Sequence, residues 1–344
     1  MSASGPILVT GATGFFGGNL ARELVSSGER VRVLVRGGRR PIALDGLACE
    51  VAEGDIRDER ALAGAVRGCR QVYHAAASIA MWCRDRSGFE EVRDVNVGGT
   101  RRLLRAAAEA RVERVVHVST VDAIGLAPPG RIADESTDWP PGRLATPYAI
   151  TKREAEAVAL SADVPTVVVN PCFMLGPLDS KPSSGRLLLP LIHGPVVVCP
   201  RHGGNNFVDV RDAVAGTIAA MAVGRPGERY ILGHANMTYR ELFAGALRVL
   251  GRHAVLLPLP SPCLLAAGYA MEAAGRLTGR EPRLPLELAR LASADHYYDS
   301  GKAIRELRLP QTPIEVALRD AFAWYRSAKA GSEQRTTIEG RETE

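Results

Sequence analysis

A glycine-rich turn near the N-terminus constrains the fold of this chain most strongly. The apolar run "PILVT" (residues 6–10) leads directly into "GATGFFGGNL", which places Gly11, Gly14 and Gly17 at intervals of three. Glycines between a strand and a helix allow a tight turn, and they let the backbone approach a pyrophosphate at the helix N-terminus. The spacing is GxxGxxG rather than GxGxxG, so the surrounding elements must support a dinucleotide site.

The order of elements along the first half of the chain provides that support. Apolar runs typical of strands alternate with segments of helical periodicity. Such alternation predicts parallel βαβ units with right-handed crossovers. The expected fold class is therefore α/β, with a doubly wound parallel sheet of the Rossmann type. The expected strands cover residues 6–10, 30–36, 48–55, 70–77, 114–120 and 165–171, and the expected helices cover 14–27, 58–66 and 89–110.

The pattern changes after Pro171, where proline and glycine become frequent and later segments are mostly helical. We expect an NADP-binding Rossmann domain made of residues 1–170 plus about 207–233. A smaller, mostly helical substrate-binding lobe would contain residues 171–206 plus about 234–328. Residues 329–344 are polar, and we expect them to form a disordered tail.

Charge and cysteine usage narrow the functional class. The net charge of +5 is spread along the chain without a basic stripe, which argues against a nucleic-acid partner. The six cysteines are scattered, with no CxxC and no spacing typical of metal ligands, so we expect reduced thiols and no metal site. The N-terminus has no signal-peptide pattern. These features predict a cytoplasmic protein.

One long apolar stretch, residues 255–275, requires a separate interpretation. It is interrupted by three prolines and contains Glu272, so it does not predict an integral membrane segment. We expect a connecting loop followed by a helix. A segment that contacts a membrane surface is the alternative.

The end of the second strand indicates which dinucleotide binds. NAD enzymes place an acidic residue there for the ribose 2′-hydroxyl, whereas an arginine accommodates a 2′-phosphate. Here Arg36 occupies that place, and Arg39 and Arg40 follow. The sequence favours NADP(H) over NAD(H), although solvated surface arginines would give the same pattern. Asp55 and Ile56, at the end of the third strand, are placed to meet the adenine.

Seven motifs occur along the chain in one order: "GATGFFGG", "GDIRD", "YHAAA", "DVNVGGT", "VHVSTVDAIG", "YAITK" and "NPCFMLGP". Over residues 5–326 this order resembles the extended short-chain dehydrogenase/reductase family. Within it, "KPSSGRLL", "GERYILG" and "YYDSGKAIREL" are most similar to the branch of dihydroflavonol reductases and 3β-hydroxysteroid dehydrogenases.

The resemblance implies roles for single residues. Tyr148 and Lys152 match the catalytic tyrosine and lysine of the family, and Thr120 matches its catalytic serine or threonine. Ser119 remains an alternative to Thr120. The substrate-binding residues expected are Met81, Trp82, Thr120, Tyr148 and Met174. The cofactor-binding residues expected are Gly11, Thr13, Gly14, Phe15, Phe16, Gly17, Arg36, Arg39, Asp55, Ile56, Ala75, Ala76, Lys152, Pro171 and Phe173.

These residue types suit hydride transfer to a carbonyl group, which leaves an alkoxide that needs a proton. Tyr148 would supply the proton, and Lys152, one helical turn away, would lower the tyrosine pKa toward neutrality. Thr120 would donate a second hydrogen bond. The sequence predicts an NADPH-dependent reductase of a ketone or aldehyde on a largely apolar small molecule. A nucleotide-sugar epimerase or dehydratase is the alternative, a catalytically silent dinucleotide sensor is a third interpretation, and a homodimer is left open.

Overall fold

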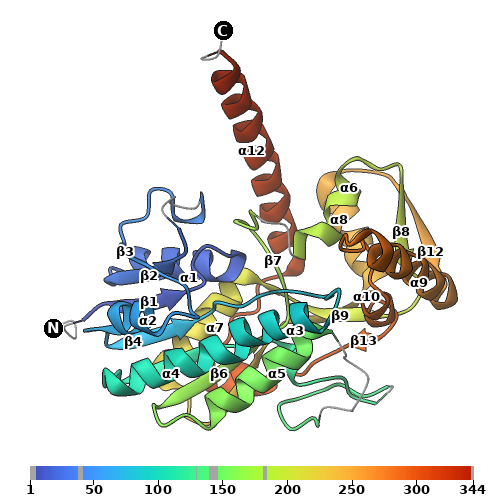
Figure 1. Cartoon of the computed structure of the whole chain (residues 1–344). Coiled ribbons are helices and arrows are strands. Elements are labelled where there is room, and N and C mark those ends of the chain that lie inside the picture. Colours follow the sequence, from blue (N-terminus) through green and yellow to red (C-terminus); the bar gives the residue numbers. More distant parts are fainter. Residues whose placement is uncertain (1–4, 38–41, 129, 139–145, 181–183, 342–344) are drawn as a thin grey trace.

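The computed structural model describes residues 5–37, 42–128, 130–138, 146–180 and 184–341. Within these residues, seven parallel strands form a central sheet in the order β10-β6-β5-β4-β1-β2-β3 (Figure 1). The order reverses between β1 and β4, and doubly wound sheets bind ligands at such a point. The strands are β1 (Ile7–Thr10), β2 (Val31–Val35), β3 (Glu50–Glu53), β4 (Gln71–His74), β5 (Arg114–Val118), β6 (Thr166–Pro171) and β10 (Arg229–Leu232).

Helices cover both faces of this sheet (Figure 1). One face carries α1 (Phe15–Ser26), α7 (Val210–Val223) and α11 (Gly301–Leu307). The other face carries α2 (Glu59–Val66), α4 (Gly99–Glu109) and α5 (Pro147–Leu160), with α3 (Arg86–Arg93) leading into α4. The central strands of a sheet with both faces covered are buried, which explains why β1, β5 and β6 are mostly apolar, whereas the edge strand β3 is largely exposed. The expected doubly wound α/β fold is confirmed.

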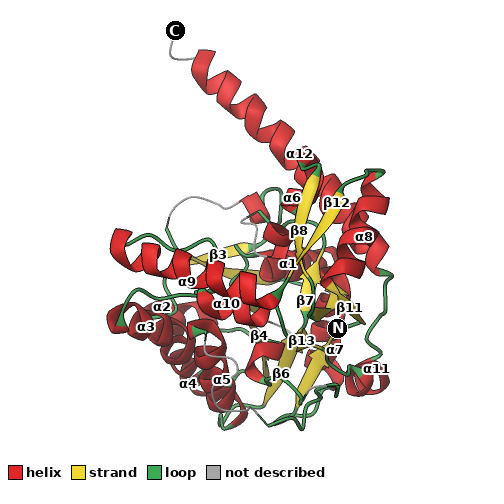
Figure 2. Ribbon diagram, turned by 90° about the vertical axis from the view of Figure 1, so that its right-hand side faces the viewer, coloured by secondary structure: helices red, strands yellow, loops and turns green. Residues whose placement is uncertain are grey.

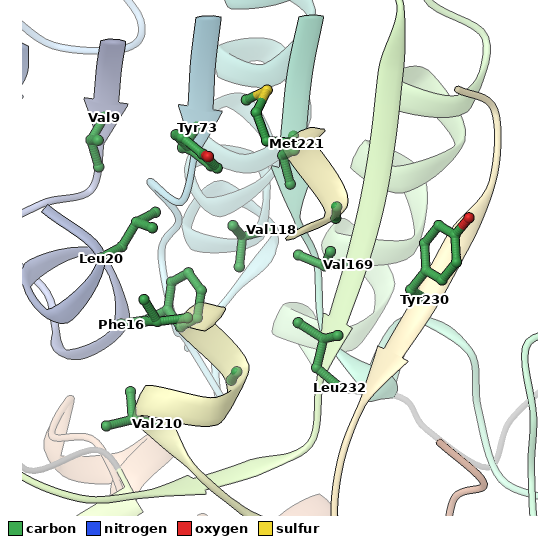
Figure 3. Close-up of a cluster of buried hydrophobic side chains, with 14 of the residues drawn as sticks. Val9, Phe16, Leu20, Tyr73, Val118, Val169, Val210, Met221, Tyr230 and Leu232 are labelled. Carbon is green, nitrogen blue, oxygen red and sulfur yellow. The ribbon is translucent and has the colours of Figure 1, made fainter. Parts of the chain in front are cut away.

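The core between the sheet and α1 and α7 is built from large apolar side chains. Figure 3 shows Phe16 and Leu20 of α1 close to Val210 of α7 and to Val118 and Val169 of the sheet. Leu20 and Val169 are fully buried. Burial of each such side chain contributes about 1.5–3 kcal/mol to folding, so this cluster fixes α1 against the strand ends that carry the site.

The second lobe combines helices with two smaller sheets (Figure 2). In the described residues, β7 (Phe173–Leu175), β9 (Gly204–Asp209), β11 (Ala235–Thr238) and β13 (Asp295–His296) form one sheet, and β8 (Val196–Pro200) pairs with β12 (Val255–Leu259) in the other. The helices are α6 (Leu189–His193), α8 (Tyr239–Leu250), α9 (Ser261–Thr278), α10 (Leu286–Leu291) and α12 (Ile314–Arg341).

Three elements differ from the expectations. The helix expected over 89–110 is interrupted by a π-helical turn at Asp94–Gly98, and within this turn the side chain of Asn96 accepts the N–H of Ser78 in the loop beside it. Residues 255–259 form β12 rather than a loop, since they pair with β8. The tail expected to be disordered is helical as far as Arg341, because residues 314–341 lack proline and continue α12.

Candidate active site

The glycine turn has the geometry that a pyrophosphate requires. Gly11 has φ 74°, and a Cβ on it would lie 2.5 Å from the carbonyl oxygen of Ala75. A Cβ on Gly17 would lie 2.3 Å from the carbonyl oxygen of Gly11. Gly14 caps α1 without a side-chain hydrogen bond, so the first N–H groups of the helix face the turn without a side-chain acceptor. A dinucleotide phosphate fits this helix N-terminus.

The side chains expected to bind the cofactor around this turn differ in how deeply they are buried. Thr13 and Phe15 are half-buried beside it, whereas the side chain of Phe16 enters the core, so only its backbone can meet a ligand. Ala75 contacts Gly11, and Ala76 donates its N–H to the Thr10 hydroxyl. The small residues at the end of β4 therefore allow β1 and β4 to approach closely at the switch point.

The structure places Arg36 and Asp55 next to each other. Arg36 follows β2 and is largely exposed, with its guanidinium 3.8 Å from the Asp55 carboxylate. Asp55 also accepts two hydrogen bonds from the Arg57 side chain, which hold its pKa below the ordinary value. Ile56 is buried against Gly99. Arg39 lies outside the described residues.

Three polar groups meet at the carboxyl end of β5. The Thr120 hydroxyl lies within hydrogen-bonding reach of Tyr148, and this contact lowers the tyrosine pKa. Tyr148 and Lys152 lie one turn apart on α5, which begins at Pro147 with Thr146 as its N-cap. The ammonium of Lys152 is buried and donates to the carbonyl of Val118 at 2.8 Å.

Ser119 faces a different group. Its hydroxyl donates to the Glu156 carboxylate at 2.6 Å, and its side chain is buried. Residues that alternate along an extended segment point to opposite sides, so Ser119 and Thr120 cannot both reach Tyr148. The geometry brings Thr120, not Ser119, to the tyrosine.

The surroundings of Tyr148 shift its pKa in opposite directions. Burial raises the pKa of Tyr148 above its ordinary value, and the nearby carboxylate of Asp122 raises it further. The Thr120 contact lowers the tyrosine pKa and so opposes these effects, whereas the Lys152 ammonium donates to the carbonyl of Val118. Burial lowers the pKa of Lys152 itself to about 8, with Glu156 acting in the opposite direction. Desolvation outweighs the charge of Lys152, which points to Val118.

Several known proteins are similar to this chain. Residues 7–233 match the NAD dependent epimerase/dehydratase family. The chain is 37% identical over 331 residues to a provisionally named dihydroflavonol 4-reductase of Synechocystis sp., covering 93% of this chain and 94% of that protein. It is also 37% identical over 328 residues to sterol demethylase protein B of Methylococcus capsulatus, covering 93% and 98%.

The chain belongs to this family. A crystal structure of a protein named gox2253 superimposes with a TM-score of 0.81 at 35% identity, covering 94% of this chain and 98% of that one. As a family member, the chain is an NAD(P)-dependent oxidoreductase with a Rossmann-like fold.

The apolar residues expected to bind substrate lie at two places, in the loop after β4 and in β7. Met81 and Trp82 follow β4 and are half-buried, and the indole N–H of Trp82 is buried without a partner among the described residues. Phe173 of β7, which like Pro171 was expected to bind the cofactor, packs edge-on against Phe207, with ring centroids 5.4 Å apart, so its ring belongs to the lobe core. Met174 is half-buried, and Pro171 is buried at the end of β6.

Asn96 and Thr151 connect the loop after β4 with α5. The Asn96 amide donates to Thr151 of α5 and to the carbonyl of Ser78, and its oxygen accepts from the Ser78 N–H. The N–H of Tyr148 donates to the carbonyl of Ala80. The loop after β4 and the start of α5 are therefore held in one register, and the π-helical turn is what aims Asn96 at both.

Glu156 is the main residue that sequence interpretation missed. It is buried one turn beyond Lys152 and accepts hydrogen bonds from Ser119, Asn170 at 2.7 Å and Arg229 at 3.1 Å. The (i, i+4) spacing from Lys152 in "KREAE" was the available signal. Asp122 was also missed. It lies two residues after Thr120, and burial raises its pKa to about 6.

Proposed function

We propose that this chain is an NADPH-dependent reductase of a ketone or aldehyde group on a largely apolar small molecule. The observation that carries the proposal is the contact between Thr120 and Tyr148 at the carboxyl end of β5, with Lys152 behind it. Open parallel sheets bind ligands at this edge, and the glycine turn of β1 opens on the same edge. The residues 171–206 and about 234–328 would complete the substrate site.

The residues present can perform the proton side of a reduction. When bound, the nicotinamide supplies the hydride. Tyr148 is protonated at neutral pH and can donate its proton to the developing alkoxide, and its raised pKa makes it a weaker acid than a free tyrosine. Thr120 can donate a second hydrogen bond to the same oxygen. The charged Lys152 favours the negative oxygen electrostatically, and Glu156 keeps it charged.

Support for NADP(H) comes from Arg36 and its neighbours. Arg36 is largely exposed at the end of β2 and has only one long ion pair, with Asp55 at 3.8 Å, among the described residues. Its guanidinium is thus free to turn to a 2′-phosphate, which arginine binds in a two-pronged geometry. Arg36→Ala should raise the KM for NADPH about ten-fold and leave the KM for NADH unchanged. Equal changes for both cofactors would contradict the proposal, and Arg86→Ala, far along the chain on α3, is the control.

Support for an apolar substrate comes from the pocket residues and from the relatives. Met81, Trp82 and Met174 provide apolar surface with one unpaired indole N–H. The relatives described above carry a dihydroflavonol and a sterol in their names. Both compounds present a hydroxyl or carbonyl group on an apolar skeleton.

The test is NADPH oxidation measured across ketones, aldehydes and nucleotide sugars with the purified chain. A reductase consumes NADPH in step with product, and Tyr148→Phe should lower kcat by about 10²–10⁴ while NADPH binding, followed by fluorescence, stays the same. A nucleotide-sugar epimerase would show turnover without net NADPH consumption. Either that result, or wild-type kcat in Tyr148→Phe, would refute the proposal.

A further inference from the structure

The outer face of α9 is apolar along its whole length. Cys263, Ala266, Ala270, Ala273 and Leu277 follow one another at steps of three and four residues, and all are exposed. Tyr269 and Leu277 have 63% and 87% of their surface in solvent. A surface helix normally carries charged residues on its outer face. From Ser261 to Gly275 the charged residue of α9 is Glu272, which turns inward to accept the N–H of Leu286.

The fold does not use these outer side chains. The inner face of α9 packs through Leu264, Gly268 and Gly275, which are buried. A Cβ on Gly268 would lie 3.0 Å from the side chain of Ala289, and one on Gly275 would lie 2.8 Å from the carbonyl of Arg280. These two glycines let α10 and the turn after α9 approach closely. The opposite face of the helix therefore has no partner in the described residues.

The strand pair of β8 and β12, which leads into α9 through Pro260, carries a second group of exposed apolar side chains. Val196 and Val198 of β8 pair with Val255 and Leu257 of β12, and all four side chains are about half exposed. Together with α9 these strands carry seven of the thirteen large apolar side chains that are exposed in the described residues. Both elements lie on the side of the molecule that faces the viewer in Figure 2. Exposed apolar surface gathered in this way marks an interaction site.

Positive charge surrounds the C-terminal end of α9. Arg280 and Arg283 follow the helix, and Arg84 lies beside Gly279, where a Cβ would be 3.0 Å from its guanidinium. All three are exposed, and none has an ion-pair partner among the described residues. The acidic residues nearby are Asp85 and Glu281. The rim of the apolar face is thus net positive.

We propose that α9 and the β8–β12 pair dock on the surface of an anionic lipid bilayer. An apolar helical face with arginines at its edge lies in the interface of such a membrane, with the apolar side chains among the acyl chains and the arginines at the phosphates. Tyr269 suits the boundary because its ring is apolar and its hydroxyl is polar. None of the helices in the described part of the chain combines the length and hydropathy that a bilayer crossing requires.

The position of α9 would bring the membrane close to the proposed substrate pocket. Its C-terminal end touches Arg84, two residues beyond Trp82, so the membrane would lie next to the segment proposed to line the substrate pocket. This step rests on the proposed function, because it makes the substrate a ketone or aldehyde that resides in the bilayer. An apolar substrate could then enter the pocket without crossing water.

Vesicle flotation of the full chain tests the proposal. The wild type should float with vesicles of phosphatidylcholine and phosphatidylglycerol but not with phosphatidylcholine alone, and binding should weaken at high salt. Tyr269→Ser with Leu277→Ser should reduce the bound fraction at least about ten-fold. Arg280→Glu with Arg283→Glu should reduce it by about five-fold for each arginine. Val223→Ser with Ile304→Ser, also exposed apolar residues, should bind as the wild type.

Two results would overturn the proposal. One is a wild type that fails to float with anionic vesicles. The other is an α9 variant that floats normally but changes from dimer to monomer in sedimentation velocity, since the face would then bind a second copy of the chain. Failure of the proposed function is visible separately, because the flotation readout needs no catalysis. If both proposals hold, the α9 variants keep their activity on a water-soluble ketone and lose it on a vesicle-borne one.

Discussion

Glu156→Gln removes the charge of the buried carboxylate and keeps the shape of the side chain. The carboxylate lies one turn from Lys152 and raises the lysine pKa, which burial has lowered to about 8. An opposite charge at short range shifts a pKa by about 1–3 units. Loss of that charge should therefore lower the Lys152 pKa by at least about one unit, which corresponds to about 1.4 kcal/mol.

The sign of the effect on activity follows from the role of Lys152. The protonated ammonium is the form that favours negative charge on the reacting oxygen, so the reduction rate should fall as pH rises through the Lys152 pKa. In Glu156→Gln this fall should begin at lower pH. The variant should also lose stability, because Arg229 loses its carboxylate partner while Ser119 and Asn170 can keep theirs. Breaking such a buried pair costs about 3 kcal/mol.

The assay is kcat/KM for NADPH oxidation from about pH 6 to pH 10, with urea unfolding to confirm that the variant is folded. Glu154→Gln is the matched control, because it makes the same change two residues away at a half-exposed ion pair with Arg93. Its pH profile should match the wild type. A high-pH limb that stays in place in Glu156→Gln, or moves equally in Glu154→Gln, would refute the coupling.

The remaining predictions concern the other polar groups and the glycine turn. Thr120→Ala should lower kcat about 10²-fold with little change in stability. Ser119→Ala should lower the free energy of unfolding by about 1–3 kcal/mol and leave kcat near the wild-type value. The reverse pattern would show that Ser119 is the catalytic hydroxyl and Thr120 the structural one. Gly17→Ala should abolish NADPH binding in fluorescence titrations, because its Cβ would lie 2.3 Å from the Gly11 carbonyl oxygen. Tight binding by that variant would show that the turn can open.

The sequence was sufficient for the features that depend on chain order. The central strands of the Rossmann sheet are short, mostly apolar runs between turns, and glycines mark the first crossover, so fold class and family could be predicted. Tyr148 and Lys152 were visible because helical spacing places them on one face. The choice between Ser119 and Thr120 could not be made, since it depends on which way each side chain leaves the strand end.

The features that were missed depend on contacts between distant segments. Glu156 gains its importance from Asn170 on β6 and Arg229 on β10, and no local pattern joins these residues. The π-helical turn at Asn96 depends on a loop that the side chain meets only after folding. The lowering of the Tyr148 pKa by Lys152 stays a prediction, because spacing along a helix says nothing about desolvation or about where the ammonium points, and here the ammonium donates to the carbonyl of Val118.

The raised tyrosine pKa bears on proton transfer in both directions of catalysis. Oxidation of an alcohol needs Tyr148 as a base, and burial together with the Asp122 carboxylate disfavours the tyrosinate that would serve. Reduction needs the protonated phenol, which these same surroundings favour. The pKa of Asp122 is about 6, so its carboxylate is mostly ionised at neutral pH and acts against the tyrosinate there. Donation of the proton in a reduction creates that same tyrosinate, so burial and Asp122 oppose proton transfer in both directions, and the Thr120 contact, which lowers the tyrosine pKa, assists it in both.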